Sequence, residues 1–111
     1  LDDIFYLPKA TANSEPAWFG FILTVKDHFK RNDIVTYLEK HKIQTRNLFA
    51  GNLIKHPCFE HLKLNTDYKI SGKLLNTDFV MNNSFWVGVY PGMKPGALDY
   101  IISKIREFVK K

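Results

Sequence analysis

The chain has one cysteine and no long apolar run. Its 111 residues include a single thiol, Cys58, which excludes an internal disulfide and a cysteine-rich zinc site. We interpret Cys58 as a small apolar filler beside Pro57 and Phe59 rather than as a nucleophile. No stretch of about 18 apolar residues is present, so we expect no transmembrane helix. Residues 1–4 lack the basic and then apolar pattern of a secretory signal, and a cytoplasmic protein is the expectation.

The motifs that usually carry catalysis are also missing. No nucleophile elbow surrounds any of the serines, and no glycine-rich loop connects a strand to a helix. His56 and His61 lie five residues apart and close to Glu60, but this spacing matches no strong metal-binding motif. Taken alone, the chain carries no catalytic residues and no metal site.

Positive charge is in excess but is not concentrated. Sixteen lysines and arginines against eleven acidic residues give a net charge of +5. The basic residues are spread along the whole chain, and no stretch combines them with aromatic side chains in a nucleic-acid motif. We therefore expect a solvated basic surface and no nucleic-acid partner. That surface can still attract an anionic ligand such as a nucleotide diphosphate.

Two apolar, β-branched and aromatic runs predict strands at residues 18–25 and 85–90, with a shorter strand at 43–46. Gly20 lies inside the first of these runs, where it marks either a bulge or the close approach of another group. The second run is ended by Pro91 and a glycine. Both long runs have the continuous apolar character of buried strands.

Three segments predict helices. Asn32 or Asp33 caps a helix that extends to about His41, which we place on the surface at the helix end. Asn76 caps a short helix over residues 75–81, and an apolar stripe predicts a longer helix over residues 95–111. A further short helix within residues 53–62 is interrupted by proline, and residues 64–73 form a polar connector.

This order of elements predicts a small α/β (α+β) domain. The expected architecture is a three-stranded, mainly antiparallel sheet with helices packed on one face. Residues 1–15 are interpreted as an extended entry segment or linker and residues 16–111 as the domain, since the small polar stretch before Pro16 is typical of a boundary. We expect part of the sheet or its loops to rest against another domain or subunit.

Arg46 is the best single candidate for a ligand contact. Its guanidinium is a planar, permanently charged donor for phosphate or carboxylate, and it lies next to a loop with Gly51 and Asn52. A surface or interdomain salt bridge is an equal alternative for Arg46. Asn52 can instead hold the loop through its own backbone, and Asn82 can cap the turn before the last strand.

Three motifs carry a resemblance to a known family. Residues 43–52 read Ile-Gln-Thr-Arg-Asn-Leu-Phe-Ala-Gly-Asn, residues 76–78 read Asn-Thr-Asp, and residues 85–92 read Phe-Trp-Val-Gly-Val-Tyr-Pro-Gly. In this order they resemble the C-terminal small domain of the fold-type-I, pyridoxal-phosphate-dependent sugar aminotransferase and dehydratase family. The resemblance covers about residues 14–109 and is strongest to the branch that removes the 3-hydroxyl of CDP- or GDP-linked 4-keto-6-deoxy sugars.

The resemblance implies that this chain is a fragment of a larger cytoplasmic enzyme. In that family a large N-terminal domain holds pyridoxal or pyridoxamine phosphate, and a histidine replaces the anchoring lysine in the 3-dehydratase branch. The implied reaction eliminates the 3-hydroxyl on the path to dideoxy sugars of lipopolysaccharide O-antigen, and an iron–sulfur reductase completes it in some members. The implied partners are a nucleotide-diphosphate sugar, the chain's own large domain and a second subunit of a homodimer.

By the same resemblance, Gln44 and Arg46 face the sugar or its phosphates, while Phe49, Gly51 and Asn52 line the mouth of the site. No catalytic, cofactor-binding or metal-binding residue is expected in this chain. Two rival hypotheses remain: a sugar aminotransferase of the same fold, and a free-standing nucleotide-sugar binding module. The sequence leaves open the nucleotide, the sugar, the oligomeric state and the choice of histidine or lysine at the cofactor anchor.

Overall fold

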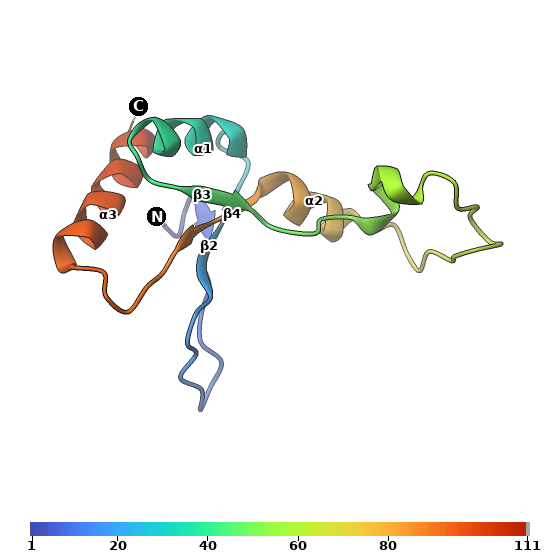
Figure 1. The fold of residues 1–111 in the computed structure, drawn as a ribbon, viewed down its shortest axis with the longest axis horizontal. Helices are drawn as coiled ribbons and strands as arrows, with labels where there is room; N and C mark the ends of the chain where they lie inside the picture. Colours follow the sequence, from blue (N-terminus) through green and yellow to red (C-terminus); the bar gives the residue numbers. More distant parts are fainter. Residues whose placement is uncertain (111) are drawn as a thin grey trace.

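The computed structural model describes residues 1–110 and shows a four-stranded antiparallel sheet (Figure 1). The strands are β1 (Phe5–Tyr6), β2 (Gly20–Val25), β3 (Thr45–Asn47) and β4 (Ser84–Gly88), and their order across the sheet is β1-β2-β4-β3. The predicted α/β class, with antiparallel strands and helices, is confirmed. The expected number of three strands was too low, because β1 lies within residues 1–15.

Strand β1 belongs to the sheet because of one buried aromatic residue. Phe5 is 1% exposed and pairs with Val25 of β2, and its ring makes an edge contact with Phe29 at 5.9 Å between centroids. A strand of two residues has no alternating pattern that a sequence can reveal, so only the pairing with β2 identifies it. Residues 1–15 therefore contribute a strand to the sheet, while their assignment as an entry or linker segment and the domain boundary at residue 16 stay predictions.

Two helices cover one face of the sheet: α1 (Arg31–Lys40) and α3 (Pro95–Val109). Helix α1 begins after Lys30, two or three residues before the predicted caps, and no side chain caps it. Burial of apolar area drives this packing, and each fully buried side chain of this kind contributes about 1.5–3 kcal/mol. The buried apolar residues are Phe5, Leu23, Val25, Ile34, Leu38, Ile43, Phe85, Val87 and Ile105.

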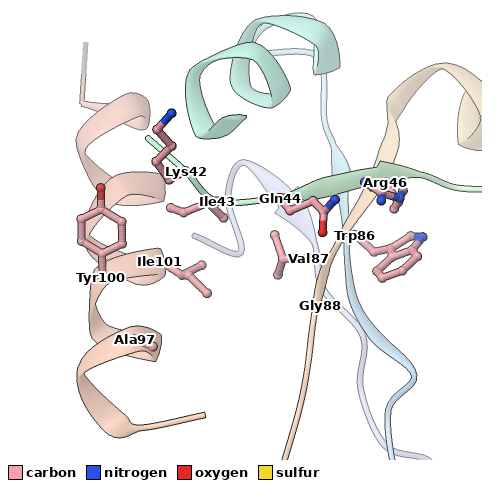
Figure 2. Close-up of a pocket in the computed structure, with 10 residues that line it drawn as sticks. All are labelled: Lys42, Ile43, Gln44, Arg46, Trp86, Val87, Gly88, Ala97, Tyr100 and Ile101. Atoms are coloured by element: carbon pink, nitrogen blue, oxygen red, sulfur yellow. The ribbon is translucent and has the colours of Figure 1, made fainter. Parts of the chain in front are cut away.

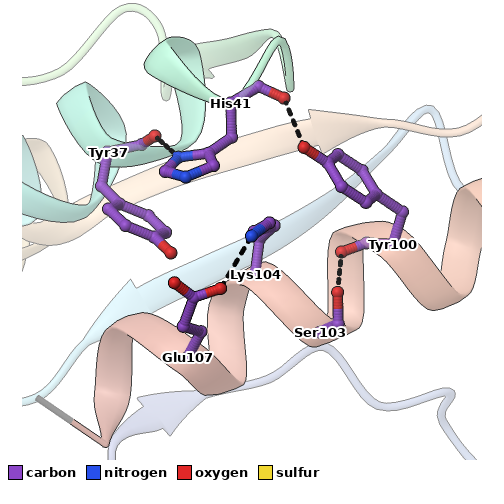
Figure 3. Close-up of polar contacts among 6 residues, drawn as sticks. All are labelled: Tyr37, His41, Tyr100, Ser103, Lys104 and Glu107. Atoms are coloured by element: carbon purple, nitrogen blue, oxygen red, sulfur yellow. Dashed lines mark hydrogen bonds and ion pairs between the residues drawn. The ribbon is translucent and has the colours of Figure 1, made fainter.

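Polar groups join α1 to α3 above this core (Figure 3). The Tyr100 hydroxyl donates to the backbone carbonyl of His41 at 3.1 Å, and the His41 ring stacks at 4.2 Å on that of Tyr37. Lys104 pairs with Glu107 at 2.7 Å within α3. Burial, followed by a hydrogen bond with Glu107, raises the pKa of Tyr37. His41 thus lies at the end of a helix, as predicted, in a contact between helices.

Residues 48–83 project away from the sheet, and we call them the arm (Figure 1). The arm contains two 3-10 turns, η1 (Leu53–Lys55) and η2 (Pro57–Phe59), and the helix α2 (Leu75–Asn83). Helix α2 begins after Leu74, which has a left-handed φ of 52°, so Asn76 lies in its first turn and does not cap it. Cys58 is exposed, so the interpretation of its side chain as a small apolar packing filler is wrong.

No helix within residues 1–110 has both the length and the apolar character needed to cross a membrane.

Candidate functional site

The face of the sheet opposite α1 and α3 presents Arg46, and the strand register explains why. Arg46 pairs with Trp86, and Trp86 pairs with Ile22, so these three side chains form a row across β3, β4 and β2. Alternate residues of a strand point to opposite faces, so their neighbours Val87 and Leu23 enter the core instead. Arg46 is therefore held at a fixed place on the open face.

The Trp86 ring is fitted closely into this row. A Cβ atom added to Gly20 would lie 2.5 Å from Cε3 of Trp86, which is an impossible contact. The ring of Phe19 lies 5.3 Å from that of Trp86 on the same side. The regular pairing of Gly20 with Gly88 shows no bulge, so Gly20 permits close approach, which was one of its two sequence interpretations.

The guanidinium of Arg46 is exposed but oriented. Its Nη1 donates to the backbone carbonyl of Thr45 at 2.9 Å. With the Gln44 amide oxygen facing it, Arg46 also donates to Gln44 at 3.1 and 2.8 Å. Among residues 1–110 no carboxylate lies within ion-pair distance of Arg46, so the salt-bridge alternative is not realised in this part of the chain. Gln44 thus orients Arg46 and leaves other guanidinium donors for a ligand.

A pocket of about 370 Å³ lies where β3 and β4 diverge, and we call it the fork pocket (Figure 2). Its polar side comes from the β3 edge and its apolar wall from α3. Two cations and no acidic residue line it, which favours an anionic ligand over a cationic one. The lining residues are Lys42, Ile43, Gln44, Arg46, Trp86, Val87, Gly88, Ala97, Tyr100 and Ile101.

Two of the three predicted mouth residues, Phe49 and Gly51, line a second hollow at the base of the arm. Phe49 and Gly51 share this hollow with three residues of α2, of which Asn76 and Thr77 provide polar groups and Val80 an apolar one. Phe49 is 71% exposed, so its ring is available to a ligand or to another surface. The structure therefore places four of the predicted residues in two hollows, with Gln44 and Arg46 in one and Phe49 and Gly51 in the other.

Asn52 has a different environment from the rest of the predicted group. It is only 2% exposed, and its side-chain amide donates to Oδ1 of Asp78 at 2.8 Å. Its backbone N–H donates to Sδ of Met81 at 3.3 Å. The sequence alternative, that Asn52 holds the loop, is realised through its side chain as well as its backbone. A direct contact between Asn52 and a ligand stays a prediction.

Sequence reasoning missed Asp78 as a member of this site. The carboxylate accepts from Asn52 and pairs with Lys55 at 2.8 Å. The hydrogen bond from Asn52, and then that from Lys55, lower the pKa of Asp78 below its usual value. The available signal was the Asn-Thr-Asp triplet, which was read as part of a helix start. Its partner lies 26 positions earlier in the chain, and no pattern links the two.

The arrangement supplies binding groups rather than reacting groups. Within residues 1–110 no three histidine, cysteine, aspartate or glutamate side chains lie close enough together to hold a metal ion. His56 contacts the backbone carbonyl of Ala50 at 2.5 Å and so braces the loop. What remains is an oriented cation, an amide, an indole and an exposed aromatic ring, which suit the recognition of a ligand with anionic and apolar parts.

Comparison with known proteins identifies the family. Residues 1–106 match the DegT/DnrJ/EryC1/StrS aminotransferase family, and the chain belongs to it. This agrees with the family that the three sequence motifs resemble.

Two curated relatives align along nearly the whole chain. The chain is 48% identical over 104 residues to the lipopolysaccharide biosynthesis protein RfbH of Salmonella typhimurium strain LT2, which covers 92% of this chain and 23% of the relative. It is 45% identical over 107 residues to the dTDP-4-dehydro-2,6-dideoxy-D-glucose 3-dehydratase of Saccharopolyspora spinosa. This alignment covers 95% of this chain and 22% of the relative. The chain therefore spans less than a quarter of the length of these relatives.

A solved structure shares the fold. Escherichia coli GDP-4-keto-6-deoxy-D-mannose-3-dehydratase with bound hydrated PLP superposes with a TM-score of 0.73 at 23% identity. The match covers 91% of this chain and 25% of that one. At this identity the likeness shows the fold alone.

Proposed function

We propose that this chain is the C-terminal small domain of a nucleotide-sugar 3-dehydratase. The observation that carries the proposal is the identity of 45% to a relative named as a 3-dehydratase, over 95% of this chain. The reaction class is removal of the 3-hydroxyl from a 4-keto-6-deoxy sugar carried on a nucleotide diphosphate. The similarity to a lipopolysaccharide biosynthesis protein supports a role in making dideoxy sugars of the O-antigen. The intact enzyme is a cytoplasmic homodimer in this proposal.

The role of the chain is to bind and position the substrate. The anionic diphosphate contacts Arg46, since the fork pocket carries two cations and no acid. Gln44 keeps the guanidinium in place through its amide oxygen. The exposed Phe49 ring and the backbone around Gly51 line the mouth of the site. Fixing the substrate in one orientation lowers the entropic part of the barrier for a reaction carried out elsewhere.

The residues present do not fit pyridoxal phosphate itself. A site for this cofactor needs an acidic or basic partner for the pyridine nitrogen and a cradle for its phosphate. Within the described part of the chain, Lys42 and Arg46 are the only charged residues that line the fork pocket, and no acid lines it. Cofactor binding is therefore assigned to the part of the protein outside this chain, where the cofactor supplies an electron sink for elimination.

The second candidate is a sugar aminotransferase of the same architecture. The description of the matching family favours it, since that family is named for aminotransferases. Both enzymes need the same small domain, so the structure of this chain does not separate them. The residue at the cofactor anchor of the large domain does: histidine supports dehydration and lysine supports transamination.

The test uses the full-length protein with pyridoxamine phosphate and CDP-, GDP- and dTDP-linked 4-keto-6-deoxy sugars. Mass spectrometry of the sugar reports loss of the 3-hydroxyl, and spectra of the bound cofactor report transamination. We expect dehydration of one nucleotide sugar, and a KM raised roughly tenfold by Arg46→Ala, the effect of losing one charged hydrogen bond. Arg106→Ala removes a cation from α3 outside the fork pocket and serves as the matched control.

Transamination without loss of the 3-hydroxyl would establish the aminotransferase instead. An Arg46→Ala enzyme with the KM of wild type would remove Arg46 from the substrate site. Tight, saturable binding of a nucleotide sugar by the 111-residue chain alone would instead support the free-standing module.

A further inference from the structure

The loop of residues 48–52, here called the site loop, is attached to α2 by hydrogen bonds from Asn52 and by packing against Met81. Asn52 is the one buried residue within the arm, and its amide hydrogen bond ends on Asp78. Lys55, three residues further on, pairs with the same carboxylate oxygen at 2.8 Å. A single carboxylate on α2 therefore accepts from Asn52, the last residue of the site loop, and from Lys55 just after the loop.

The backbone of the site loop is constrained from the same side. Gly51 has a φ of +78°, and a Cβ atom added there would lie 2.8 Å from Cγ of Met81. Met81 and Asp78 are three positions apart in α2 and so lie on the same face of the helix. The site loop thus rests on two residues of one face of α2, Asp78 providing charge and Met81 providing shape.

We propose that Asp78 is a positioning residue that sets the place of the site loop, and with it the placement of Phe49, relative to the fork pocket. The inference rests on the proposed function, since the site loop lines the mouth of that site. Asp78 does not reach the substrate in this proposal and acts through Asn52. It adds a specific residue of α2 to a site that sequence reasoning confined to residues 44–52.

The position of α2 in the fold explains how the contact between Asp78 and Asn52 can set the place of the site loop. Helix α2 runs directly into β4, the strand that carries Trp86, and Arg31 of α1 donates to the carbonyl of Met81 at 2.9 Å. The Tyr6 ring of β1 also contacts Phe79 at 6.2 Å between centroids. Helix α2 is therefore fixed to the sheet, and Asp78 transfers that fixed position to the site loop.

Two substitutions of Asp78 separate charge from hydrogen bonding. Asp78→Ala removes the acceptor, so Asn52 is left buried without a partner for its amide. Asp78→Asn keeps an oxygen that accepts from Asn52 and loses only the ion pair with Lys55. Asp67→Ala is the matched control, since Asp67 is another arm carboxylate and accepts only from the nearby backbone N–H of Lys63.

The experiment measures steady-state kinetics and amide hydrogen exchange of the full-length protein. For Asp78→Ala we expect a KM raised about tenfold with kcat within about twofold, as a misplaced binding loop weakens substrate binding. Peptides covering residues 46–56 should exchange faster, while those from α3 should not change. Asp78→Asn should restore most of both properties, and Asp67→Ala should match wild type.

Each outcome bears on one proposal. An Asp78→Ala enzyme with wild-type KM, or with unchanged exchange in the site loop, overturns the positioning role. Equal losses in Asp78→Ala and Asp78→Asn overturn the role of the Asn52 hydrogen bond. A wild-type protein without activity on any nucleotide sugar overturns the proposed function, which is a separate result from an active wild type that does not respond to Asp78.

Discussion

The sheet with α1 and α3 differs from the arm in what holds it together. Within residues 1–110, all nine buried apolar residues belong to the sheet, its two covering helices and the approach to β3, and none lies between residues 48 and 83. The arm buries one residue, and it is the polar Asn52. Apolar burial is non-directional, whereas a hydrogen bond requires a defined distance and angle between donor and acceptor. The first region is thus organised by hydrophobic area and the arm by a few directed contacts.

The arm also exposes large apolar side chains. Phe49 is 71% exposed and Leu75 67%, although side chains of this kind pack into the core elsewhere in the chain. A segment of this size has too few inward positions to build a core of its own. We therefore expect the arm to pack against the remainder of the full-length protein, which agrees with the prediction that loops of this domain rest on another domain or subunit.

The largest expected effect is a loss of stability on substitution of a buried residue in the first region, the sheet with α1 and α3. Phe85 is fully buried in β4, and Phe85→Ala should lower the free energy of unfolding by about 3–5 kcal/mol through lost transfer energy and a cavity. Leu75→Ala removes an exposed side chain from the arm and should change it by less than about 0.5 kcal/mol. Urea denaturation measures both. Similar losses for the two variants would contradict the division into a hydrophobic region and a polar arm.

A smaller effect is expected in the arm, where Gly51 packs closely against Met81. Gly51→Ala forces a left-handed alanine, at about 1–2 kcal/mol, and drives its Cβ into Met81. Gly72 also has a left-handed φ, of +76°, but no atom lies near the position of an added Cβ. Gly72→Ala therefore measures the cost of the left-handed backbone alone. We expect amide exchange near residue 51 to accelerate more than exchange near residue 72. Addition of Met81→Ala to Gly51→Ala should recover the difference, and no recovery would argue against the Met81 contact.

The smallest expected effect is the stability that is lost at low pH when the carboxylates of Glu39 and Asp78 become protonated. Hydrogen bonds from the backbone and hydroxyl of Thr45 lower the pKa of Glu39 below its ordinary 4.5, and those from Asn52 and Lys55 lower the pKa of Asp78 below 3.8. Because the folded pKa is the lower one, each carboxylate stabilises the fold above its ordinary pKa, and the contribution disappears as the pH falls through the folded value. Solvent exposure keeps both contributions small.

Amide exchange between pH 6 and pH 3 tests this prediction in the two regions separately. Glu39→Gln should remove the extra acid sensitivity of β3, and Asp78→Asn that of the site loop. Each substitution should leave the other region unchanged, since the two carboxylates have separate partners. A single common acid transition in all variants would show that the two regions unfold together.

Much of the first region was predictable from patterns. The apolar runs around Leu23 and Phe85 located β2 and β4, and the stripe ending near Val109 located α3. These signals are local, because periodicity is carried by residues close in the sequence. Strand β1 had no such signal, and the start of α1 at Arg31 lacked the capping side chain that sequence reasoning looks for. Pairing and packing decided both.

The site was predictable in composition but not in geometry. Arg46 and the loop through Asn52 were identified from residue chemistry and from resemblance to a family to which the chain belongs. Their separation into two hollows, and the partnership of Asn52 with Asp78, depend on contacts between residues far apart in the chain. Whether each residue contacts a ligand stays a prediction.

The amino-acid sequence by itself determined the family, the α/β class and the location of the longer helices and strands, because short-range pattern and motif carry that information. Only the tertiary structure decided the fourth strand, the orientation of Arg46 by Gln44 and the attachment of the site loop to Asp78. The physical reason is that a hydrogen bond or a strand pair forms between groups that folding brings together, and its energy depends on a distance that no local pattern encodes.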